Sequence, residues 1–131
     1  MDAGEGAIVC DQETDGELMS YIFIQTEAKG CLVRVRIDDV FYVESASNYL
    51  KINLEKQCHS TYLTITEMEE ALPAENFMRV HRSFLVNMNR IISVTGAMIT
   101  LENGKYIFAG PNYKEPFLER INAMVLKSKR R

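Results

Sequence analysis

Alternating apolar and polar positions dominate the chain from Tyr21 onward and predict a mainly β fold. Apolar and basic residues alternate over 32–36, and Leu50, Ile52 and Leu54 share one side of the next alternating stretch. A period of two is typical of strands that bury one face. The strands that we expect cover residues 21–26, 32–36, 40–44, 48–54, 59–63, 77–81, 84–86, 91–94, 98–101 and 105–109.

Turn signals separate these strands. Asn103-Gly104 is the strongest of them, because a tight hairpin turn needs residues that accept positive φ. Residues 28–30 and 45–48 are further turn clusters, and Arg82-Ser83 forms a bend between two strands. Phe84 and Val86 follow this bend at alternating positions, so we expect them to be buried opposite Val80. We therefore expect the strands to be joined mainly as hairpins.

Two short segments of the chain, each expected to form a corner between two strands, are weakly similar in sequence. Residues 35–40 resemble residues 86–91, since in each a strand meets a polar-rich single turn and then another strand. Two similar corners indicate small sheets packed side by side. They do not indicate a solenoid, which needs three or more repeats.

Two segments carry helical signals. Thr64 and Glu67 fit a capping box, and Pro73 ends the short helix that follows. The apolar face of this helix comprises Ile65, Met68 and Leu72. A second helix is expected over about 116–126, where helical spacing predicts one buried stripe. That stripe comprises Phe117, Ile121, Met124 and Val125.

The first 20 residues differ from the rest of the chain. They contain six acids and no Lys or Arg, and they are Gly-rich and without a period. We expect residues 1–20 to be a disordered tail or interdomain linker, and residues 21–128 to be one folded domain. The remainder of the chain holds 12 acids against all 15 bases, so it carries a formal charge of +3.

Composition places the chain among ordinary soluble domains. It has 131 residues, of which 47% are hydrophobic and 25% charged, with a formal net charge of −3. This excludes a wholly disordered chain, a collagen and a disulfide scaffold. The apolar runs are far too short for a membrane span, and no leader opens the sequence, so we expect a cytoplasmic protein.

Candidate catalytic and metal-binding residues are few. The three cysteines, Cys10, Cys31 and Cys58, form no CxxC pair and are expected to be reduced thiols. Cys58 and His59 are neighbours on a strand, where they point to opposite faces. Without paired spacing, a zinc site formed by Cys31, Cys58, His59 and His81 is not expected. We expect no enzyme, no cofactor and no metal; a hydrolase using His81 is a weak third hypothesis.

The segment 77–87 is the strongest candidate for binding chemistry. It interleaves apolar anchors with His81, Arg82, Ser83 and Asn87, and it lies in a stretch, 76–101, that contains no acid. Arg, Asn, His and Ser side chains can contact bases or phosphates. The alternative is that His81 is a core histidine and Asn87 only caps the turn that follows it. Composition leaves these two interpretations equally open.

The chain resembles the LytTR DNA-binding domain, the output module of the LytR/AlgR class of bacterial response regulators. The resemblance covers about residues 21–126 and rests on runs of matching residues. These runs are Ile37–Glu44, Asn48-Tyr49, Phe77–Asn87 and Asn103–Lys105. The resemblance implies an elongated, mainly β fold of small sheets side by side, with one short internal helix and a C-terminal helix.

The resemblance also implies which residues contact DNA. Loops on one edge, and no recognition helix, would enter successive major grooves. The implied contacts are Asn48, Tyr49, Lys51, His81, Arg82, Ser83, Asn112 and Lys114. The last two stand in a loop where the family usually has a basic pair; here Gly110-Pro111 precedes them and the expected Arg is missing.

The function implied is sequence-specific binding of double-stranded promoter DNA in two-component transcription regulation. We expect a monomer in solution, two copies on repeated half-sites, and a receiver domain as a possible upstream partner. The alternative is a β-rich protein-interaction module that has lost DNA contact through the Gly110-Pro111 change.

Overall fold

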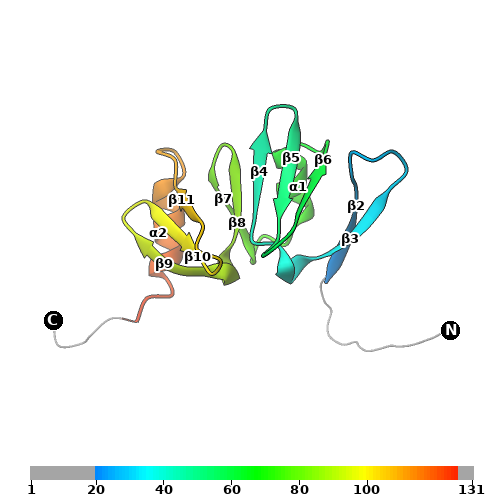
Figure 1. Cartoon of the computed structure of the whole chain (residues 1–131). Coiled ribbons are helices and arrows are strands. Elements are labelled where there is room, and N and C mark those ends of the chain that lie inside the picture. The colour runs from blue at the N-terminus through cyan, green and yellow to red at the C-terminus, as the bar shows by residue number, and fades with distance from the viewer. Residues whose placement is uncertain (1–19, 127–131) are drawn as a thin grey trace, which may run out of the picture.

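The structure is a computed structural model that describes residues 20–126 (Figure 1). The tail expected over residues 1–20 and the end of the domain expected at 128 lie largely outside these residues. Ten of the expected elements recur as strands, in sheets of two, five and three strands. The strands are β2 (Tyr21–Gln25), β3 (Leu32–Arg36), β4 (Tyr42–Ala46), β5 (Tyr49–Asn53), β6 (Cys58–Thr61), β7 (Phe77–His81), β8 (Phe84–Asn87), β9 (Ile91–Thr95), β10 (Met98–Leu101) and β11 (Tyr106–Phe108). The helices are α1 (Ile65–Ala71), α2 (Lys114–Asn122) and the 3₁₀ turns η2 (Ile37–Asp39) and η3 (Met88–Arg90).

The three sheets stand side by side in one row (Figure 1). The β2–β3 hairpin lies at one end, the sheet β6-β5-β4-β8-β7 is central, and β11-β10-β9 lies at the other end beside α2. All pairings in the described chain are antiparallel. The expected arrangement of small sheets with one internal and one C-terminal helix is confirmed.

The central sheet separates two hydrophobic cores. Val43, Ile52 and Leu85 lie in register on one face and pack with α1 and the β2–β3 hairpin. Tyr42 and Val86 lie on the opposite face and pack with β9–β11 and α2. Both faces are buried at the start of β4 and along β8, and residues 40–43 and 84–86 accordingly read in the sequence as short continuous apolar runs.

The local signals of α1 and of both corners are confirmed. Thr64 Oγ1 accepts the Glu67 amide at 3.1 Å, and Glu67 Oε1 accepts the Thr64 amide at 2.9 Å, which completes the capping box. The three apolar residues expected on the face of α1 are buried. The similarity between residues 35–40 and 86–91 extends to the structure, since each segment forms a 3₁₀ turn between two strands.

Asn87 is a structural residue. Its side chain is 1% exposed, its Nδ2 donates to the Val40 carbonyl at 2.9 Å, and its Oδ1 accepts the Asn89 amide at 2.9 Å. These two bonds join the corner at η3 to the segment between η2 and β4. Asn87 therefore caps the turn η3, which is one of the two interpretations that the sequence left open. Its buried side chain cannot contact DNA.

Asn87→Ala is expected to lower the free energy of unfolding by about 1–3 kcal/mol, because it leaves the buried Val40 carbonyl without a partner. Urea denaturation measures this loss. Asn89→Ala is the matched control, since Asn89 is exposed and only its backbone N–H is used. Equal midpoints for the two variants would contradict the assigned role.

Two expectations about burial are wrong. Met124 and Val125 are 65% and 45% exposed, because α2 ends at Asn122 and the chain leaves the core there. Phe84 was expected to be buried with Val86 opposite Val80, but it is only half-buried at the rim of the second core. Full burial is confirmed for the two valines.

The start of α2 also differs from expectation. The helix begins at Lys114, two residues before Pro116. The first N–H groups of a helix have no partner within it, so a proline in the first turn removes no hydrogen bond. Phe117 then follows as the residue that anchors α2 in the second core.

Candidate nucleic-acid interface

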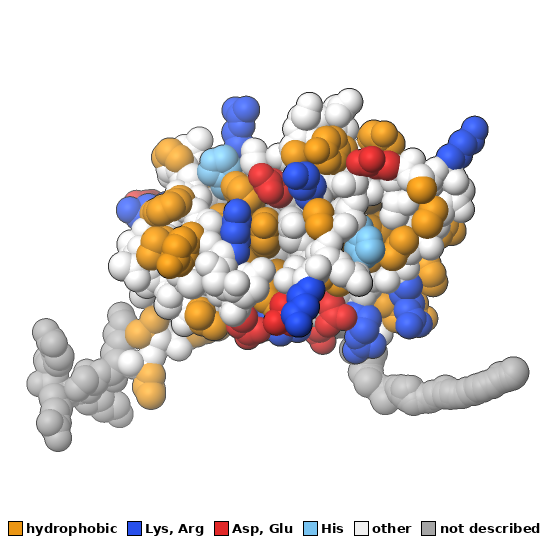
Figure 2. Space-filling model, viewed as in Figure 1, with side chains coloured by type: hydrophobic (Ala, Val, Ile, Leu, Met, Phe, Trp, Pro, Cys, Tyr) orange, Lys and Arg blue, Asp and Glu red, His pale blue; other side chains and the backbone are white. Residues whose placement is uncertain are grey.

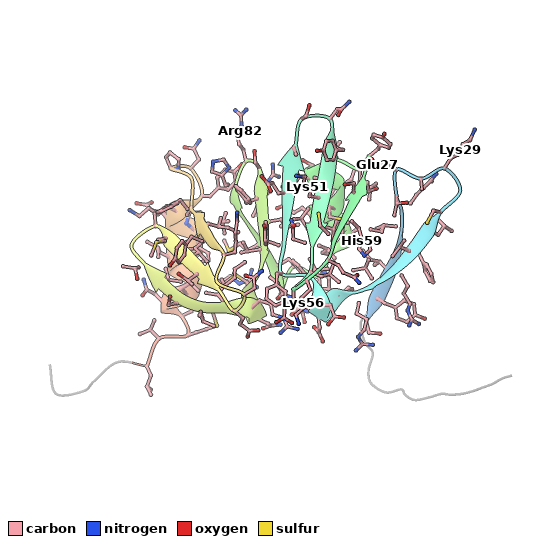
Figure 3. The ribbon with its side chains drawn as sticks, in the orientation of Figure 1. Glu27, Lys29, Lys51, Lys56, His59 and Arg82 are labelled. Atoms are coloured by element: carbon pink, nitrogen blue, oxygen red, sulfur yellow. The ribbon has the colours of Figure 1, made fainter. Side chains whose placement is uncertain are left out.

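Four connections lie along one edge of the molecule (Figure 1). They are the β2–β3, β4–β5 and β7–β8 turns and the loop between β11 and α2. Figure 3 shows Lys29 and Arg82 extending from this edge, which we call the loop edge. Hairpins that stand side by side bring their turns into one row, which explains how residues far apart in sequence share an edge.

The β7–β8 turn carries Arg82. Its side chain is exposed, points away from the body of the molecule, and makes no hydrogen bond or ion pair within the described residues (Figure 3). The backbone of the same turn is held firmly. The Ser83 amide donates to His81 Nδ1 at 3.0 Å, and the Ser83 carbonyl accepts the Ser45 amide at 2.8 Å. In the part of the chain that the structure describes, Arg82 is thus a cation without a partner on a turn with a fixed backbone.

His81 links two of the loops. It is half-buried, and its ring lies 5.6 Å from the Phe84 ring in an edge-on arrangement. Because Nδ1 accepts a hydrogen bond, neutral His81 carries its proton on Nε2 and can donate from there. The Gly110 amide donates to the Val80 carbonyl at 2.8 Å. A Cβ at Gly110 would lie 3.3 Å from His81 Cδ2, so the glycine permits this close approach.

The β4–β5 turn separates the three residues expected there. Asn48 is exposed at the tip, next to Ser47 with a φ of 56°, and Tyr49 is half-buried at the start of β5. Lys51 is half-buried and paired with Glu44 across the ladder. It lies on the face of the central sheet below the turn (Figure 3). Lys51 is therefore set back from the loop edge.

The loop before α2 presents its two expected residues to solvent. Asn112 is exposed in the turn closed by the bond from the Tyr113 amide to the Gly110 carbonyl, at 3.0 Å. Lys114 is exposed as the first residue of α2. The structure thus brings the three groups of candidate residues to the loop edge, with the exception of Lys51.

The opposite edge is acidic. Figure 2 shows Asp and Glu side chains gathered there, beneath the central sheet, with Lys56 among them. Arg90 on this edge is neutralised, since Nη1 pairs with Glu102 at 2.9 Å and Nη2 donates to the Asp38 carbonyl at 2.7 Å. Of the two edges, the loop edge, from which Lys29 and Arg82 extend, is therefore the more favourable one for a polyanion.

Sequence reasoning missed two features of this surface. Lys29 was treated only as part of a turn, although it shares the loop edge with Arg82; Glu27 lies nearby (Figure 3). Arg79, from the acid-free stretch, pairs with Glu69 at 2.9 Å and is not available to a ligand. Lys29 could have been identified from the sequence as a candidate contact, because it is a cation in an expected hairpin turn.

Among residues 20–126, no three His, Cys, Asp or Glu side chains gather as metal ligands. Burial raises the pKa of the Cys58 thiol, Lys51 lowers it and Glu44 raises it, so the net effect favours the un-ionised thiol. None of the described helices is long and apolar enough to cross a membrane.

Comparisons with known proteins agree on one family. The sequence model of the LytTr DNA-binding domain matches residues 30–122. The chain is 35% identical over 63 residues to the sensory transduction protein LytT of Bacillus anthracis, and 34% identical over 55 residues to the transcriptional regulatory protein YpdB of Escherichia coli K12. These matches cover 48% and 42% of this chain, but 26% and 22% of the relatives.

A solved structure has the same fold. It is the LytTr DNA-binding domain of a Bacillus cereus protein described as a methyl-accepting/DNA response regulator. The TM-score is 0.69 at 25% identity, and the match covers 79% of this chain and 97% of that one. The chain therefore corresponds to about one whole domain of this kind, and to about a quarter of the length of the curated relatives.

Proposed function

Because the chain belongs to the LytTR DNA-binding domain family, we propose that it binds double-stranded DNA at preferred sequences and so regulates transcription. The observation that carries this proposal is the exposed Arg82, which has no partner among residues 20–126 and stands on a turn whose backbone is fixed by neighbouring elements. A rigid support matters, since a base contact needs its donors in one orientation. The opposite edge is acidic, which supports a complex in which the loop edge faces the DNA.

Each loop has a chemical role in the proposal. Arg82 would donate to O6 and N7 of a guanine, and Asn48 would pair with an adenine in a neighbouring groove. Asn112 and Lys114 would contact phosphates, which fix the register without reading sequence. His81 and Ser83 would support the turn that carries Arg82. Tyr49 and Lys51 lie on β5, directly after the Asn48 turn, and would support that turn.

The biological setting is part of the proposal. Relatives named as a sensory transduction protein and a transcriptional regulator are about four times longer than the matched segment. We infer that the domain is the output module of a cytoplasmic two-component response regulator, and that a receiver domain is its regulatory partner.

The test is selection from a pool of random duplexes, followed by binding measurements on the enriched duplex and on a scrambled duplex of equal composition. We expect a clear preference for the enriched duplex and weaker binding to both at higher salt, because phosphate contacts release counterions. Failure to enrich any sequence would remove specific DNA binding from the account.

The stoichiometry is a separate prediction. The domain is expected to be a monomer in solution and to occupy two half-sites whose centres are about 34–36 Å, one helical turn of DNA, or a multiple of that apart. Light scattering on the free protein and on a two-site duplex measures both states. A stable dimer without DNA would contradict this.

The second candidate function is protein interaction, and one observation favours it. A groove of about 570 Å³ lies between β2 and the segment after β6, lined in part by Phe23 and Tyr62, which are exposed. The selection experiment separates the two functions, because a pure interaction module would enrich no duplex.

A further inference from the structure

Four consecutive carbonyls of the Arg82 turn accept hydrogen bonds that are not backbone bonds of the β7–β8 ladder. The Val80 carbonyl accepts from Gly110 and the Ser83 carbonyl from Ser45, both at 2.8 Å. The carbonyls of His81 and Arg82 accept from one side chain, that of Arg79.

All three nitrogen atoms of the Arg79 guanidinium donate hydrogen bonds. Nε donates to the His81 carbonyl at 3.1 Å, Nη2 donates to the Arg82 carbonyl at 2.7 Å, and Nη1 pairs with Glu69 of α1 at 2.9 Å. The side chain is 17% exposed. A planar fork can hold three partners in fixed directions, which a lysine ammonium on a flexible stem cannot do.

The backbone explains why the turn needs this support. The β7–β8 register shifts between Arg79 and His81, so Val80 is a bulge. A bulge disrupts the ladder locally and redirects the side chains that follow it. The two carbonyl bonds of Arg79 hold the backbone at His81 and Arg82, directly after this bulge.

We propose that Arg79 and Glu69 are positioning residues that set the base preference of Arg82 without touching DNA. The inference rests on the proposed function. Glu69 orients the guanidinium, the guanidinium fixes the peptide planes on both sides of the Arg82 Cα, and the fixed backbone directs the Arg82 side chain. Helix α1 is thereby connected to the loop edge.

The chain supplies its own control. Arg90 on the acidic edge has the same kind of contacts, with Glu102 on Nη1 and the Asp38 carbonyl on Nε and Nη2. Arg79→Lys and Arg90→Lys therefore remove equivalent bonds, but only the first removes them from the turn of Arg82. Glu69→Gln is compared with Glu70→Gln, since Glu70 is exposed on the same helix.

Binding of each variant is measured on the duplex enriched by the wild type and on its scrambled counterpart, at two salt concentrations. Arg79→Lys should reduce the preference for the enriched duplex by about tenfold, the scale of one lost base contact. Its binding to the scrambled duplex and its salt dependence should be unchanged. Arg90→Lys and Glu70→Gln should keep the preference, whereas Glu69→Gln should lower it.

Two further readouts separate positioning from general stability. In an Arg82→Ala background, Arg79→Lys should reduce the preference no further, because the two residues act through one contact. In the free protein, Arg79→Lys should speed hydrogen exchange of the Ser83 and Ser45 amides, and Arg90→Lys should not. If Arg79→Lys does not fold, Glu69→Gln carries the same comparisons.

Equal loss on both duplexes with a shallower salt dependence would show that Arg79 contacts phosphate, and would overturn the inference. An unchanged preference in Arg79→Lys and Glu69→Gln would also overturn it while leaving the proposed function intact. Absence of any preference in the wild type would instead overturn the proposed function, and this inference with it.

Discussion

Replacing Phe117 by alanine is expected to lower the free energy of unfolding by about 3–5 kcal/mol. Phe117 is fully buried and packs in the second core with Ile99, Leu101 and Ile107. Its removal leaves a cavity between α2 and the sheet β11-β10-β9, which the rigid strands cannot close. Urea denaturation measures the loss, and the cooperative transition should remain.

Phe108→Ala provides the matched control. Phe108 lies on β11 close to the same core, but it is 62% exposed. Loss of the same phenyl ring should then change the free energy of unfolding by no more than about 0.5 kcal/mol, as is usual for surface substitutions. Similar losses for both variants would mean that α2 does not pack as described.

Arg82→Ala has the largest expected effect on binding. If Arg82 reads a guanine, its loss should cost about 1–3 kcal/mol on the enriched duplex and relax the preference at one position. The folded state should be unaffected, because the Arg82 side chain has no partner among the described residues. Titrations of the enriched duplex, and of duplexes changed at one position each, measure both effects.

Lys105→Ala is the control for that measurement. Lys105 lies immediately before β11, at the opposite end of that strand from the loop before α2, and its Nζ lies 5.5 Å from the centre of the Tyr42 ring. Its replacement should leave the sequence preference intact. If Arg82→Ala instead weakens binding to all duplexes alike with a shallower salt slope, Arg82 contacts phosphate only.

Much of the fold could be predicted because its signals are local. Alternation over a few residues marks strands, and the Thr64–Glu67 capping box and the Asn103-Gly104 turn each depend on neighbours in sequence. The similarity between 35–40 and 86–91 correctly predicted two equivalent corners. In each case the deciding atoms are close along the chain.

What could not be predicted depends on distant partners. Asn87 could be assigned to a cap only once its amide was seen to meet a carbonyl 47 residues away. The ion pair of Arg79 crosses from β7 to α1, and no pattern in the stretch 76–101 indicates it. An acid-free segment looked uniformly available to DNA, although two of its arginines are occupied.

The candidate site was predicted by resemblance in its residues but not in its geometry. Arg82 and Asn48 were expected on separate turns, and the structure places both turns on the loop edge (Figure 1). The resemblance could not show that Lys51 stands back on the sheet beside Glu44. Nor could it show how closely Gly110 approaches His81, which depends on the absence of a Cβ.

The most direct test of the account is the affinity of the wild-type domain and of Arg82→Ala for the enriched and the scrambled duplex. The account predicts that the wild type prefers the enriched duplex, that the preference falls by at least about fivefold in Arg82→Ala, and that binding to the scrambled duplex changes little. Equal affinity of both proteins for both duplexes would contradict it.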